Sequence, residues 1–144
     1  MSENDERIES RQEVEAYIQN LRYALDNGAK ITIQEERLID RNRDPRYTNK
    51  FTLADLFPEE SPVDAVKREL KAITVEDYMK TVRDTKYKNH SEFRQFGEKY
   101  NGADVYIKIR VELVSLYGGK SVFIMSFHYA EYEFLEGAFP YKGQ

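Results

Sequence analysis

The feature of this sequence that most constrains its fold is a strict alternation of apolar and polar residues in the C-terminal half. Over residues 105–113 every second position is valine, isoleucine or leucine. The positions between them hold Tyr106, Lys108, Arg110 and Glu112. A period of two predicts a strand with one buried face. Residues 121–129 are apolar on both faces, which is typical of a central strand, and the glycines at 118–119 predict a tight turn between the strands.

The N-terminal half has the spacing of helices instead. Ser10 and Glu13 form a capping-box pattern that predicts a helix start. Apolar residues follow at helical spacing as far as the Asn-Gly pair at 27–28, which favours a helix end. Residues 29–34 alternate and predict a short strand, and the basic, turn-rich residues 37–50 predict a strand end followed by a loop.

Further signals divide the rest of the chain. Residues 52–58 predict a short helical turn ended by a proline, and Ser61 followed by proline predicts the start of a helix. Thr74 predicts another short helix, which continues to Val82. Residues 131–139 predict a third strand at the edge of the sheet.

The order of these elements predicts the fold class. With 144 residues the chain has the length of one ordinary domain. We expect residues 1–9 to form a disordered polar tail. Residues 10–144 are expected to form a single α+β domain, with an antiparallel sheet packed against the N-terminal and central helices.

Composition excludes several classes of function. The absence of cysteine excludes disulfides, thiolate zinc sites, iron–sulfur clusters and cysteine nucleophiles. No apolar run is long enough to cross a membrane, and the acidic N-terminus is unlike a targeting signal, so we expect a cytoplasmic protein without a membrane partner. Two histidines far apart in the sequence give no metal-binding pattern, and we expect neither a metal nor another cofactor.

The charge is distributed unevenly. The net charge is −4, yet residues 80–110 hold eight lysines and arginines against four acidic residues. A basic region inside an acidic protein suits a localised anionic ligand better than a long nucleic-acid track. The alternative is an ordinary solvated surface of mixed charge.

A candidate site follows from the polar face of residues 105–113. Together with Ser126 and His128 on the neighbouring strand, Tyr106, Lys108 and Arg110 form a set that can hold a phosphate and move protons; an ordinary solvent-facing sheet surface is the alternative. Pairing of Tyr117 with Ser121 would put Arg110 opposite His128. Pairing of Tyr117 with Lys120 would put Ile109 there instead, so register decides which side chains share a face.

Residues 70–131 resemble the MqsR (motility quorum-sensing regulator) family of bacterial toxins. The matching segments are LKAITVEDYMKTVRD at 70–84, YKNHSEFRQFG at 87–97, GADVYIKIRV at 102–111 and VFIMSFHYAE at 122–131. The resemblance implies a RelE-like fold and a metal-independent endoribonuclease that cleaves messenger RNA. It also implies a cognate antitoxin protein as partner, and RNA products that end in a 2′,3′-cyclic phosphate.

The resemblance also implies roles for individual residues. The catalytic positions of the family fall on Lys80 at a helix end, Arg94, Tyr106 and His128. Lys80 and Arg94 would hold phosphate, Tyr106 would orient the substrate and His128 would transfer protons. Further RNA contacts would come from His90, Gln95, Lys108 and Arg110.

Two features of the chain depart from the family pattern. Arg94 replaces a glutamine, with Gln95 next to it, and His128 replaces a lysine. The isoelectric point of about 5.3 is low for such a toxin. An alternative is therefore a catalytically inactive protein of a phage or mobile element that binds and inhibits another protein.

Overall fold

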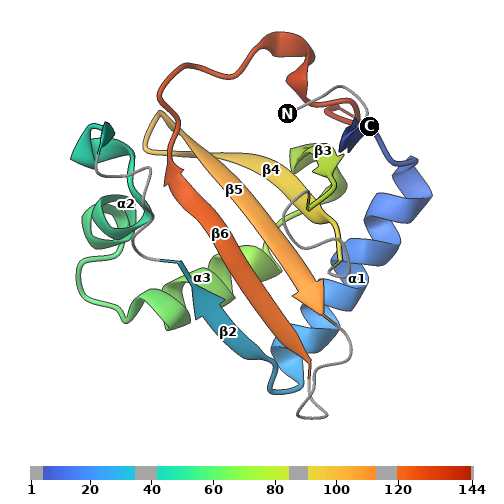
Figure 1. The fold of residues 1–144 in the computed structure, drawn as a ribbon, viewed down its shortest axis with the longest axis horizontal. Helices are drawn as coiled ribbons and strands as arrows, with labels where there is room; N and C mark the ends of the chain where they lie inside the picture. The colour runs from blue at the N-terminus through green and yellow to red at the C-terminus, as the bar shows by residue number, and fades with distance from the viewer. Residues whose placement is uncertain (1–4, 35–41, 85–90, 113–119, 144) are drawn as a thin grey trace.

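The computed structural model describes residues 5–34, 42–84, 91–112 and 120–143, and these residues form an α+β fold around one sheet (Figure 1). The described strands are β1 (Glu6–Arg7), β2 (Lys30–Ile33), β3 (Tyr78–Val82), β4 (Phe93–Tyr100), β5 (Ala103–Glu112) and β6 (Ser121–Tyr129). The described α-helices are α1 (Arg11–Asp26), α2 (Asn49–Leu56) and α3 (Pro62–Lys71). The six strands lie in the order β1-β3-β4-β5-β6-β2.

The sheet is mixed, which corrects the prediction of an antiparallel sheet. Strands β3 to β6 form an antiparallel meander and β1 pairs antiparallel with β3, but β2 runs parallel to β6. The reason is that β2 and β6 are joined through two helices and the whole meander, which leaves room for a crossover connection. The predicted pairing of the last two strands is confirmed, while the expected turn at 118–119 lies outside the described residues.

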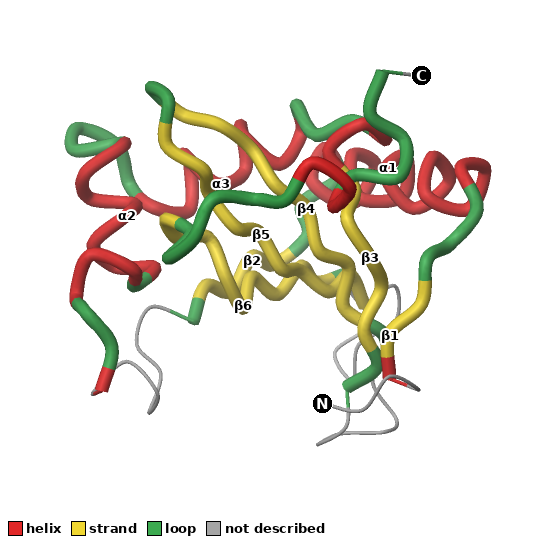
Figure 2. The backbone as a smooth tube through the Cα atoms, turned by 90° about the horizontal axis from the view of Figure 1, so that it is seen from above, coloured by secondary structure: helices red, strands yellow, loops and turns green. Residues whose placement is uncertain are grey.

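Helices α1 and α3 pack on one face of the sheet, as seen in Figure 2. The predicted capping box of Ser10 and Glu13 is present, and the apolar stripe of α1 is buried against the sheet. Ser61 caps α3 as predicted, with Pro62 in its first turn. We call the opposite side of the sheet the open face: no described α-helix packs against it, and residues 131–139 cover it only around Gly97.

Several predicted elements were wrong. The segment that begins at Thr74 is one 3₁₀ turn followed by β3, because Tyr78, Thr81 and Val82 become buried in the sheet; Lys80 therefore lies in a strand and not at a helix end. Helix α2 begins at Asn49, inside the predicted loop, because Thr48 and not Thr52 is its cap. Strand β4 has no regular alternation and was not predicted as a strand.

Both ends of the described chain differ from expectation. Residues 131–139 form an irregular segment with one 3₁₀ turn, Glu136–Ala138, and pair with no described strand. Phe134 and Phe139 pack instead on Gly97 of β4, where an added Cβ would lie 2.6–2.9 Å from their ring carbons. Residues 5–9, expected in a disordered tail, include β1 and the buried Glu9.

Candidate functional site

Strand pairing gathers most of the predicted site residues on the open face. In one row across the sheet Lys80 pairs with Gln95, Gln95 with Lys108, and Lys108 with Ser126. In the next row Gly97 pairs with Tyr106, and Tyr106 with His128. Side chains of directly paired residues share one face of a sheet. Two adjacent rows therefore present cationic, amide, phenol and imidazole groups together.

The register of β5 and β6 differs from both alternatives drawn from the sequence. Tyr106 lies opposite His128, with ring centroids 5.7 Å apart, whereas Arg110 lies opposite Phe123. Among the described residues the pairs run from Val105–Tyr129 to Glu112–Ser121. Lys108 pairs with Ser126, but the next residue, Ile109, pairs with Ile124. This β-bulge shifts the register by one residue between the two ends of the strands.

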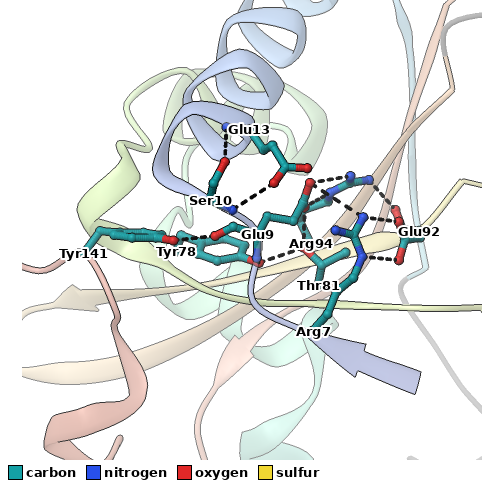
Figure 3. Close-up of polar contacts among 9 residues, drawn as sticks. All are labelled: Arg7, Glu9, Ser10, Glu13, Tyr78, Thr81, Glu92, Arg94 and Tyr141. Atoms are coloured by element: carbon teal, nitrogen blue, oxygen red, sulfur yellow. Dashed lines mark hydrogen bonds and ion pairs between the residues drawn. The ribbon is translucent and has the colours of Figure 1, made fainter. Parts of the chain in front are cut away.

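Arg94 lies on the other face. It is paired with Ile109, and its guanidinium binds both carboxylate oxygens of the buried Glu9 at 2.8 and 3.2 Å (Figure 3). The guanidinium carbon also lies 4.4 Å from the ring centroid of Tyr17 on α1. Arg94 is therefore held by the interior of the protein, and its neighbour Gln95 takes the place on the open face.

The polar cluster around Glu9 joins both ends of the described chain (Figure 3). Thr81 donates to the Glu9 carboxylate, the Glu9 amide donates to the Tyr78 hydroxyl, and the Tyr141 hydroxyl donates to the Glu9 carbonyl. Burial acts to raise the pKa of Glu9, but the hydrogen bonds from Arg94 and Thr81 outweigh it and hold that pKa below its usual value. The cluster is satisfied internally, which favours a structural role.

The two cations at the ends of the open face have different surroundings. Lys80 is one-third exposed, and its Nζ lies 2.8 Å from a carboxylate oxygen of Glu6 in β1. Arg110 is buried, with its guanidinium 2.6 Å from Asp84 and within 4.7–5.3 Å of two phenylalanine ring centroids. Arg110 thus closes one end of the open face and has little surface for RNA.

Gln95 lies between the two lysines of its row. Its side chain is 3% exposed, and its Oε1 has no hydrogen-bond partner among the described residues. A buried carbonyl oxygen without a donor is costly. Because this oxygen is buried, it lies beneath the surface that a ligand would contact.

His128 is partly buried, and its Nδ1 lies 2.9 Å from the backbone carbonyl of Tyr129. A carbonyl oxygen only accepts hydrogen bonds, so Nδ1 carries the proton in this contact and a neutral ring keeps its lone pair on Nε2. That tautomer can take a proton from a substrate hydroxyl. His90 lies outside the described residues.

An acidic cavity borders the site where residues 131–139 cross β4. It has a volume of about 510 Å³ and is lined by Gly97, Phe134, Phe139 and five carboxylate residues: Glu76, Asp77, Glu98, Asp104 and Glu136. Burial, together with the nearby Asp77, raises the pKa of Glu98 to about 8. Lys99 and Lys142 also line the cavity, so its carboxylates are partly balanced by cations.

Sequence reasoning missed the residues that hold β6 in place. Asn49 and Thr52 of α2 are buried and bind the β6 backbone. Both lie where the sequence predicted a loop or a helix start, so only the fold shows that they face β6. No group of three or more histidine or acidic side chains within the described ranges is arranged to hold a metal ion.

Comparisons with known proteins add no assignment. No family model, no curated protein and no solved structure matches the chain. Among the helices described, none combines the length and apolar character needed to cross a membrane. The candidate site therefore rests on its own geometry.

Proposed function

We propose that this protein is a metal-independent endoribonuclease, the toxin of a toxin–antitoxin pair with a RelE-like fold. The observation that supports the proposal most directly is the arrangement of Lys80, Gln95, Lys108, Tyr106 and His128 in two adjacent rows of the open face. These residues include groups suited to each task of RNA cleavage: binding a phosphate, orienting a ribose and transferring a proton. The antitoxin would bind over the same face.

The chemistry assigned to these residues is an internal transesterification. Nε2 of His128 accepts the proton of the ribose 2′-OH as this oxygen attacks the adjacent phosphorus. The ammonium groups of Lys80 and Lys108 stabilise the charge that develops on the phosphate oxygens. The bond from phosphorus to the 5′-oxygen then breaks, that oxygen takes a proton from water, and His128 releases its own proton to solvent, which leaves a 5′-hydroxyl and a 2′,3′-cyclic phosphate. Tyr106 orients the bound nucleotide.

A second candidate is a binding protein without nuclease activity. It is favoured by three ion pairs that neutralise basic side chains within the protein itself: Lys80 with Glu6, Arg94 with Glu9 and Arg110 with Asp84. Such a protein would present the same face to another protein.

An RNA cleavage assay in EDTA separates the two candidates. Purified parent protein should yield fragments with cyclic-phosphate ends. His128→Ala should lower the rate about 10²–10⁴-fold, the usual contribution of an acid–base group, and Lys80→Ala should also lower it. Lys71→Ala is the matched control, because Lys71 is an exposed lysine on α3 with its own ion pair to Asp26. A folded parent without activity, or a His128→Ala variant with full activity, would overturn the proposal.

A further inference from the structure

The half of β6 that carries His128 is bordered by a helix instead of a strand. In the described part of the chain, strand β2 pairs with β6 over residues 121–124. Beyond the bulge, α2 lies beside the last residues of β6, as Figure 1 shows. The backbone groups on this side of β6 therefore need partners from side chains.

Asn49, at the start of α2, supplies two such contacts to β6 and a third to the backbone just after β2. Its Nδ2 donates to the carbonyls of Gln34 and Met125 at 2.6 and 2.9 Å, and its Oδ1 accepts from the amide of Phe127 at 2.9 Å. The side chain is 2% exposed, so water does not compete for these bonds. Asn49 thus links the end of β2 to β6 on both sides of Ser126.

The next two contacts come one helical turn apart along α2. Thr52 is fully buried, and its hydroxyl oxygen accepts from the amide of Tyr129 at 2.9 Å. Asp55 accepts from the Tyr129 hydroxyl at 2.5 Å. Spacing of three residues places Asn49, Thr52 and Asp55 on one side of the helix. We call these three residues the α2 ladder.

We propose that Asn49 and Thr52 of the α2 ladder are positioning residues that set the orientation and tautomer of the His128 imidazole. They fix the backbone on both sides of His128, at Phe127 and at Tyr129. Tyr129 donates its backbone N–H, in the peptide unit shared with His128, to Thr52, and its carbonyl, in the following peptide unit, accepts from Nδ1 of His128. Loss of the Thr52 contact frees this backbone and weakens the preference for a proton on Nδ1.

The inference rests on the proposed function for its catalytic consequence, but the imidazole can be observed without catalysis. The chain has only two histidines, so ¹⁵N-labelled imidazole signals are assigned by comparison with His128→Ala. At a pH where the ring is neutral, the parent should show the proton of His128 on Nδ1. Thr52→Val keeps the shape of the side chain but removes the acceptor, and should give a mixture of tautomers. Thr52→Ser should restore the parent signal.

Turnover supplies the second readout. Normalised to folded protein, Thr52→Val should lower kcat about tenfold with little change in KM, and Thr52→Ser should recover most of it. Ser61→Ala is the control, because it removes a helix cap on α3 and so lowers stability away from His128. It should change neither the tautomer nor kcat.

The two possible failures are distinguishable. An inactive parent whose His128 tautomer still responds to Thr52→Val would overturn the proposed function and leave the positioning role in place. A parent-like tautomer and kcat in Thr52→Val would overturn the positioning role alone. An equal loss of kcat in Thr52→Val and Ser61→Ala would show that Thr52 acts only through stability.

Discussion

Lys80 and Arg94 make an instructive comparison, because each pairs with a glutamate of the same N-terminal segment. Arg94 binds Glu9 through two hydrogen bonds, and the side chains are only 14% and 4% exposed. Lys80 contacts Glu6 through a single bond, and both side chains are about one-third exposed. A buried pair cannot open without leaving a charge unpaired, whereas an exposed pair exchanges its partner at little cost. Enclosure, and not charge alone, decides which cation is available to a ligand.

The largest effect that would test this comparison is the removal of an enclosed arginine. Arg110→Ala removes the guanidinium that lies 2.6 Å from the buried carboxylate of Asp84, and should destabilise the protein by about 3–5 kcal/mol. Lys108→Ala, two residues along the same strand, should cost less than about 1 kcal/mol. Urea unfolding measures both. Similar losses in the two variants would break the distinction between enclosed and available cations.

A change at Glu9 should give the next largest effect, and one that depends on pH. Glu9→Gln weakens the charged hydrogen bonds to Arg94, and should cost about 1.5–3 kcal/mol at pH 7. Because folding lowers the pKa of Glu9, its contribution is present above the ordinary value of 4.5 and is lost as the pH falls through the folded pKa. The difference between parent and variant in unfolding free energy should therefore shrink below about pH 4.5. A difference that stays constant down to pH 3 would contradict this account of Glu9.

At Gly97 the open face is covered by the rings of Phe134 and Phe139. Gly97→Ala brings a Cβ within 3 Å of the Phe134 and Phe139 rings, and should cost about 1–3 kcal/mol as the rings are displaced. Gly137→Ala is the control, since nothing lies within 4 Å of its added Cβ. Thermal unfolding compares the two. Equal stability would mean that residues 131–139 do not rest firmly on β4.

The smallest effect is expected at the exposed pair. Glu6→Gln should change stability by no more than about 1 kcal/mol. It should strengthen the binding of a short RNA by up to about fivefold, because Lys80 no longer shares its charge with a carboxylate. Glu15→Gln, which opens a similar exposed pair on α1, should leave RNA binding unchanged. Weaker binding in Glu6→Gln would show that Glu6 does not compete with RNA for Lys80.

The sequence predicted the parts of the fold that local patterns determine. The alternation of β5, the capping box of Ser10 and the cap at Ser61 depend on neighbouring residues, and all were recognised. Strand β3 followed a genuine helix-start pattern at Thr74, and became a strand only through burial against β4. Such a change depends on tertiary contacts that a local pattern does not contain.

The candidate site could be predicted only as far as the register of the paired strands could be predicted. Tyr106 and Lys108 share a face through the alternation of one strand, so the sequence placed them together. The separation of Arg94 from Gln95, and the pairing of Tyr106 with His128, depend on how β4 and β6 align with β5. A shift by one residue reverses the face of every side chain. Contacts from α2 to β6 join residues more than 70 positions apart, and no local pattern predicts them.

The most direct test of the open face as the RNA-binding surface is an NMR titration of the His128→Ala variant with a short, uncleaved oligoribonucleotide. Signals of Lys80, Gln95, Tyr106 and Lys108 should shift together and saturate at one stoichiometry, while those of Tyr17 and Arg94 stay unchanged. Shifts centred on Tyr17 and Arg94, or none at saturating RNA, would contradict the assignment of the site to this face.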